Sequence, residues 1–94
     1  MIKIQITENG IHMRGHANRR VNGQDIVCAA VSALTCNLIN SLEILTDVKI
    51  RAETDSGKTD IQWEKLSEGG KLLVDSWMLG MSEINKEYNC IEFI

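Results

Sequence analysis

The feature that most constrains the fold is a stripe of apolar residues, spaced three and four apart, in the first half of the chain. Its members are Val27, Ala30, Val31, Leu34, Leu38, Leu42 and Leu45. This spacing predicts one long helix with a single apolar face, and Asp25, just before it, is a suitable N-cap residue. Such a helix must pack its apolar face against other elements of the fold.

The segments around this helix alternate like strands. In residues 1–7, apolar and polar side chains alternate, and the Asn-Gly pair within residues 8–10 favours a tight turn into a second strand over residues 11–16. A second hairpin is expected from strands near residues 48–53 and 59–64, joined by an Asp-Ser-Gly-Lys turn.

A second helix is expected from about Ser67, followed by a short strand near residues 90–94. Its apolar stripe comprises Leu73, Trp77, Met81, Ile84 and Tyr88, whereas Leu72, Met78 and Leu79 fall off it and suggest a contact with a second subunit. The order β-β-α-β-β-α-β predicts a single α+β domain over residues 1–94. We expect a two-layer sandwich, with two helices packed on a mostly antiparallel sheet.

Charge and cysteine usage narrow the class of protein. The chain has 94 residues and a net charge of −3, so binding to nucleic acid is not expected to be its main task. Uninterrupted apolar runs such as residues 28–31 are much shorter than the roughly 20 residues of a membrane span, and no secretory signal is apparent. Three cysteines without a CxxC pair favour a cytoplasmic protein.

Cys28 is the strongest candidate for chemistry. With Asp25 as the N-cap, it would be the third residue of the first helix, where the positive end of the helix dipole stabilises thiolate over thiol. The Asp25 carboxylate would oppose this effect. The alternative is that Cys28 is a small buried apolar residue, as many cysteines are.

His16 is the natural proton acceptor for this thiol. It ends the second predicted strand, and the chain must then return to the start of the helix, so the two side chains can converge. An exposed loop histidine is the alternative. The sequence leaves open whether Glu8, Asp25 or Asp47 orients the imidazole.

A zinc site is the alternative use of these residues. His12 and His16 would face the same side of a continuous strand and, with Cys28, would supply three ligands. Arg14 between them and the lack of a fourth ligand at motif spacing argue against zinc, and we expect no metal. Ser32, one helical turn after Cys28, is placed to line the same site. Two further cysteines, Cys36 and Cys90, are expected to be packing residues.

Two segments of the chain form a longer motif. They are Arg14-Gly15-His16-Ala17 and Gly23-Gln24-Asp25-Ile26-Val27-Cys28-Ala29-Ala30-Val31-Ser32-Ala33-Leu34. Together they closely resemble the ribosomal-processing cysteine protease family (Prp). The likeness extends over nearly the whole chain. It implies a cysteine endopeptidase that removes the N-terminal extension of a large-subunit ribosomal protein.

The resemblance also implies roles for individual residues. Cys28 would be the nucleophile and His16 its general base, while Gly15, Asp25 and Ser32 would shape the site. It further implies a bacterial, cytoplasmic homodimer without a cofactor, needing neither membrane nor direct nucleic-acid contact. An apolar groove beside Cys28 is expected, and movement of the loop over residues 17–24 would admit the peptide.

The sequence is also compatible with two other functions. One is a non-catalytic ribosome-associated binding protein that uses Arg14, Arg19 and Arg20. The other is a redox or metal sensor. Against a redox pair, Cys36 lies two helical turns from Cys28, about 12 Å by helix rise, which is too far for a disulfide.

Overall fold

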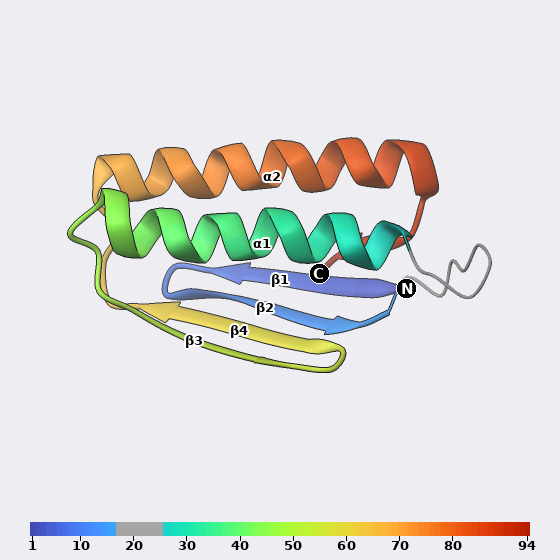
Figure 1. Ribbon diagram of the computed structural model, residues 1–94, viewed down its shortest axis with the longest axis horizontal. Coiled ribbons are helices and arrows are strands. Elements are labelled where there is room, and N and C mark those ends of the chain that lie inside the picture. The colour runs from blue at the N-terminus through green and yellow to red at the C-terminus, as the bar shows by residue number, and fades with distance from the viewer. Residues whose placement is uncertain (17–25) are drawn as a thin grey trace.

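The computed structural model describes residues 1–16 and 26–94 (Figure 1). Its elements are β1 (Ile2–Thr7), β2 (Gly10–Gly15), α1 (Ile26–Leu45), β3 (Ile50–Asp55), β4 (Lys58–Trp63), α2 (Glu68–Tyr88) and β5 (Ile91–Phe93). The predicted order of elements is therefore confirmed, and so is the α+β class.

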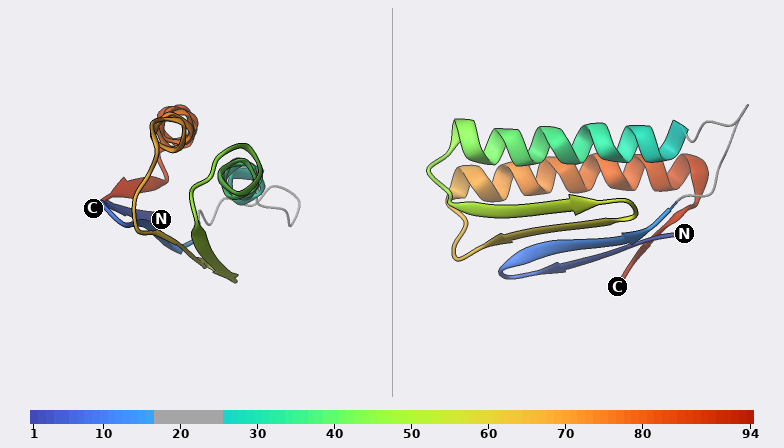
Figure 2. Two further views of the ribbon diagram at one scale, coloured as in Figure 1. Left: turned by 90° about the vertical axis from the view of Figure 1, so that its left-hand side faces the viewer. Right: turned by 60° about the horizontal axis from the view of Figure 1, so that its bottom comes forward.

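The five strands form one mixed sheet in the order β3-β4-β2-β1-β5. All neighbouring pairs are antiparallel except β1 and β5, which run parallel, because α2 carries the chain back along the sheet before β5. Both helices lie side by side on one face of this sheet, as the end-on view shows (Figure 2, left). The other face carries no helix in the part of the chain that is described.

A hydrogen-bonded chain of side chains links the two layers through the core. The indole Nε1 of Trp77 on α2 donates to Thr35 Oγ1 on α1 at 3.1 Å, and that hydroxyl lies 3.9 Å from Met13 Sδ on β2. Thr35 is buried although it was not part of the predicted apolar stripe. Leu45, which was part of it, is 72% exposed because it lies in the last, uncovered turn of α1.

The third strand is less buried than its alternation predicted. It begins at Ile50, two residues later than expected, and Ala52 is exposed. The reason is position, since β3 is an edge strand and only its first residue is partly covered. Val48, which precedes the strand, is the apolar residue that enters the core.

Close packing at the start of α2 explains the second of its two consecutive glycines, Gly70. Ser67 is the N-cap, at the residue near which the helix was expected to begin, and its hydroxyl accepts a hydrogen bond from the Gly70 amide at 3.0 Å. A Cβ at Gly70 would lie 3.0 Å from a methyl group of Val48 and 3.2 Å from one of Leu66. The loss of helix propensity at Gly70 is thus offset by close packing of the helix start on the core.

By length and composition alone, α1 is apolar enough to cross a membrane, with a mean hydropathy of 1.5 over 18 residues. The short apolar runs seen in the sequence did not anticipate this. The core helix of a globular domain has the same composition, and α1 buries one stripe against the sheet and α2.

Candidate active site

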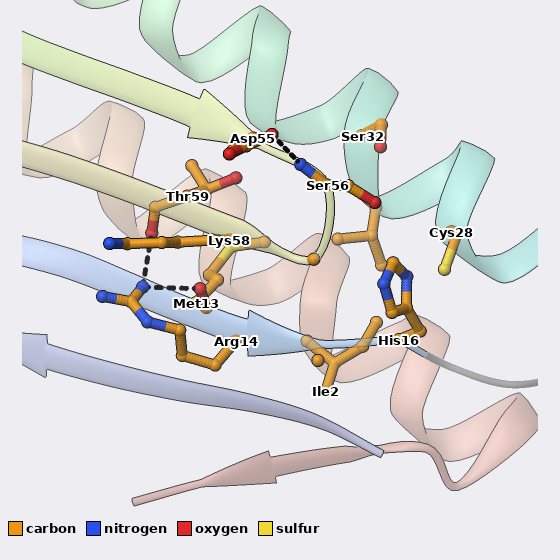
Figure 3. A pocket seen from close by; sticks show the side chains of 13 residues that line it. Ile2, Met13, Arg14, His16, Cys28, Ser32, Asp55, Ser56, Lys58 and Thr59 are labelled. Carbon is orange, nitrogen blue, oxygen red and sulfur yellow. Dashed lines mark hydrogen bonds between the residues drawn. The ribbon is translucent and has the colours of Figure 1, made fainter.

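A pocket of about 260 Å3 lies where β2 ends and α1 begins. Side chains from both hairpins and from α1 surround it (Figure 3). The lining residues are Ile2, Met13, Arg14, Gly15, His16, Cys28, Val31, Ser32, Asp55, Ser56, Gly57, Lys58 and Thr59. Most of the candidates from the sequence therefore meet at one place.

Cys28 enters the pocket from the first turn of α1. The helix begins at Ile26, so Cys28 is its third residue, as the sequence predicted, and the side chain is half-buried. In Figure 3 its sulfur points toward the His16 ring. At this position the positive end of the α1 dipole favours the thiolate form over the thiol.

His16 lies just beyond β2 and is exposed. The preceding residue, Gly15, has a φ of 101°, a conformation that L-residues with a side chain rarely adopt, and a Cβ there would collide with the Met1 carbonyl. The Met1 ammonium donates a 2.7 Å hydrogen bond to the His16 carbonyl. Gly15 thus interrupts the strand alternation and brings His16 to the helix side of the sheet.

His12, by contrast, lies on the open face of the sheet. Its Nδ1 is 2.7 Å from Asp60 Oδ1, and Arg14 lies 3.0 Å from the same oxygen. These hydrogen bonds, that from His12 first, hold the pKa of Asp60 below its usual value against the opposing effect of burial. The two histidines therefore do not share a side, contrary to what a zinc site with Cys28 required. Within residues 1–16 and 26–94, no three His, Cys, Asp or Glu side chains are grouped as metal ligands.

The other predicted residues have mixed outcomes. Gly15 and Ser32 line the pocket. Asp25, the loop over residues 17–24 and with it Arg19 and Arg20 lie outside the described residues.

The proposed orienting acids Glu8 and Asp47 lie at the other end of the fold, in the β1–β2 turn and after α1. Six strand residues separate Glu8 from the end of β2, a length of about 20 Å. Of the two remaining cysteines, Cys90 is a packing residue in the core as predicted, whereas Cys36 is exposed.

Nothing in the sequence assigned the β3–β4 hairpin to the site. Five consecutive residues, 55–59, line the pocket because β4 pairs with β2 next to His16. Among the described lining residues, Asp55 is the carboxylate, but its Oδ1 accepts from the Ser56 amide at 2.7 Å and the group points away from His16 (Figure 3). The only local signal was the turn sequence itself, and such a turn does not indicate what it packs against.

The sequence profile of the family described as cysteine protease Prp matches residues 1–91. The chain belongs to this family. Prp proteins of known function and structure can therefore be compared with it over nearly its whole length.

A relative from Staphylococcus aureus strain Mu50, the ribosomal processing cysteine protease Prp, is 29% identical over 98 residues, which cover 95% of this chain and 92% of the relative. The crystal structure of the Prp protease from S. aureus with a covalently linked product peptide superposes with a TM-score of 0.84 at 25% identity. That superposition covers 98% of this chain and 94% of the other.

A solved structure from Streptococcus mutans is also similar, with a TM-score of 0.77 at 28% identity, covering 99% of this chain and 91% of the other. These structures share the fold described above. The match to the family and the S. aureus Prp relatives identify this chain as a cysteine protease.

Proposed function

We propose that this protein is an endopeptidase that removes the N-terminal extension of a large-subunit ribosomal protein, with Cys28 as nucleophile and His16 as general base. The observation that carries the proposal is that one pocket receives both side chains, one from the start of α1 and the other from the end of β2. A thiol and an imidazole facing one cavity are the minimal set for thiol proteolysis.

The chemistry follows from these two groups. His16 takes the proton from Cys28, and the thiolate attacks the scissile carbonyl carbon to form a tetrahedral oxyanion, near the positive end of α1. Collapse of this intermediate breaks the C–N bond, and the imidazolium gives its proton to the leaving amine. Water then attacks the thioester and loses a proton to His16, and Cys28 leaves and is reprotonated.

The lining of the pocket supports a peptide with an apolar side chain next to the scissile bond. Ile2, Met13 and Val31, which are largely buried, form an apolar base to the pocket, while Lys58 brings a cation to it. The relatives are named for ribosomal processing, and one of them was crystallised with a covalently linked product peptide. A ribosomal-protein extension is the substrate class that fits both the surface and the family.

A cytoplasmic homodimer is part of the same proposal. Leu72 and Leu79 on α2 are 70% and 71% exposed, and a spacing of seven residues places them on one face of the helix. This face is suited to a second copy of the chain.

Sedimentation velocity is expected to give the mass of a dimer, and the double variant Leu72→Glu with Leu79→Glu should shift the protein toward monomer. A wild-type monomer at micromolar concentration would refute the dimer.

The experiment that tests the proteolytic function uses a peptide that spans the extension and the first mature residues of the ribosomal protein. Wild-type protein is expected to cut it once, as seen by mass spectrometry, and Cys28→Ala should lower kcat by roughly 10³-fold or more. The matched control is Cys36→Ala, on the same helix but exposed and outside the pocket, which should leave the rate unchanged. Unchanged cleavage by Cys28→Ala would remove the proposed nucleophile.

The alternative of a non-catalytic binding protein has less support. Arg14, the one of its three arginines that is described, pairs with Asp60 on the open face of the sheet. Membership of a cysteine protease family also favours catalysis.

A further inference from the structure

The Nε2 end of the His16 ring rests directly on a glycine from the β3–β4 turn. A Cβ built on Gly57 would lie 2.6 Å from Nε2 and 3.2 Å from both Cδ2 and Cε1. These separations are shorter than van der Waals contact, so any side chain at position 57 must displace the ring or the turn. The imidazole occupies the space that the missing side chain leaves.

The backbone of the same glycine is bonded to the residue before His16. The Gly15 amide donates to the Gly57 carbonyl at 2.8 Å, which continues the antiparallel ladder between β2 and β4 past the Arg14–Lys58 pair. Gly57 thus meets the Gly15–His16 segment twice, through a backbone hydrogen bond and through ring contact.

Gly57 also satisfies a separate requirement of the turn. Its φ is 70°, in the left-handed region, and the Asp55–Lys58 pairing leaves only Ser56 and Gly57 to reverse the chain. Asn tolerates this conformation better than other residues with a side chain. The backbone requirement and the ring contact can therefore be separated by comparing Asn and Ala at this position.

We propose that Gly57 is a positioning residue for His16: the β3–β4 turn holds the imidazole in place relative to Cys28, and this requires the absence of a side chain at residue 57. The inference rests on the proposed role of His16 as general base. Its consequence is that the second hairpin, about forty residues further along the chain, controls the geometry of the dyad.

Kinetic effects are expected mainly in kcat, because a displaced base impairs proton transfer more than peptide binding. Displacements of about 1 Å can cost on the order of 10²-fold in rate. We expect Gly57→Asn and Gly57→Ala to lower kcat by roughly tenfold or more, with a smaller change in KM. The matched control is Gly69→Ala on α2, where a Cβ would meet only ordinary contacts at 3.8 and 3.9 Å and activity should not change.

The closing experiment reads the histidine rings by NMR, independently of activity. In wild-type protein, NOEs are expected between the His16 ring protons and the Gly57 Hα protons. Gly57→Asn should change the His16 ring resonances and leave those of His12 in place, because His12 lies on the other face of the sheet beside Asp60. His12 therefore serves as an internal reference within each sample.

The outcomes separate the inference from the proposed function. Absence of the NOEs overturns the positioning role, whatever the kinetics of Cys28 and His16 variants. A folded Gly57→Asn variant with wild-type kcat also overturns it, as does a loss of activity with unchanged His16 resonances, which would mark a purely structural effect. If the NOEs are present but His16→Ala is fully active, the proposed role of His16 as general base fails instead. The contact between Gly57 and the His16 ring would then have no role in catalysis.

Discussion

His12 and His16 are four residues apart, yet the molecule places them in opposite surroundings. His12 lies within β2, on the face of the sheet without helices, and its ring is hydrogen-bonded to Asp60 in a cluster with Arg14. His16 lies one residue past the strand, on the helix side, where it lines the pocket with Cys28 and contacts Gly57. One imidazole is held by charged neighbours and the other by backbone geometry.

The difference shows how a strand end can create a site. Strict alternation would have put both rings on one face. A single glycine with a φ of 101° breaks that alternation and directs the next side chain toward α1. A carboxylate beside His12 suits a structural role, whereas ring contact with a glycine leaves His16 exposed and able to exchange protons with a substrate.

The largest expected effect separates the two histidines by activity. His16→Ala should lower kcat for the extension peptide by roughly 10²–10⁴-fold, because the proposed general base is lost. His12→Ala is the matched control on β2. Its kcat, calculated per folded molecule, should remain within about twofold of the wild-type kcat. Both are measured by single-cut peptide cleavage. Equal losses in the two variants would erase the distinction between the histidines.

The second effect concerns the residue that separates the two environments. Gly15→Ala forces a side chain into a positive φ and against the Met1 carbonyl, which should destabilise the protein by about 1–3 kcal/mol. Activity should fall as well, because His16 follows directly. Urea unfolding and kcat/KM of the folded protein test this prediction, with Gly69→Ala as the benign glycine substitution. A Gly15→Ala protein of wild-type stability would show that the strand end tolerates another path.

Much of the fold was predictable because its signals are local. The alternating first strand and the turn that follows it each depend on a few neighbouring residues, and both were observed within the expected stretch, although the turn is centred on Glu8-Asn9 and Gly10 already pairs with Thr7 in β2. The observed burial differs from the predicted burial at residues whose exposure is decided by tertiary contacts. Thr35 is buried because Trp77 needs an acceptor, and Ala52 is exposed because β3 is an edge strand. Neither fact is present in the neighbouring sequence.

In the site, too, the residues with local signals were predictable and those placed by tertiary contacts were not. Cys28 was identifiable from its place in a helix and His16 from its place at the end of a strand, so both were predicted to line one site, and both line the same pocket. The contribution of residues 55–59 was not, because it depends on β4 pairing with β2 and on the open space at Gly57. The absence of a side chain leaves no chemical signature in a sequence, and its role appears only when the neighbouring ring is placed.

The smallest expected effect tests the charged neighbours of His12. Since the folded-state pKa of Asp60 lies below its unfolded value of about 3.9, its stabilisation is present above that pH and is lost as the pH falls through the folded value. Asp60 has a side chain only 17% exposed, but its partners are more accessible, so Asp60→Asn should cost about 1 kcal/mol or less at pH 7. The cost should shrink as the pH is lowered below the unfolded value, because wild-type Asp60 then takes up a proton and approaches the neutral form that Asn mimics.

Urea unfolding at pH 7 and pH 3 measures this difference. Glu83→Gln removes a comparable acid from the exposed Glu83–Lys86 pair on α2 and should cost less at pH 7. Peptide cleavage by Asp60→Asn should remain close to wild type, because Asp60 does not line the pocket that holds Cys28 and His16. A large loss of cleavage in a stable Asp60→Asn protein would mean that the open face and the pocket are coupled through Arg14 on β2, which pairs with Asp60 and also lines the pocket. The surroundings of His12 would then influence the activity that is proposed to depend on His16.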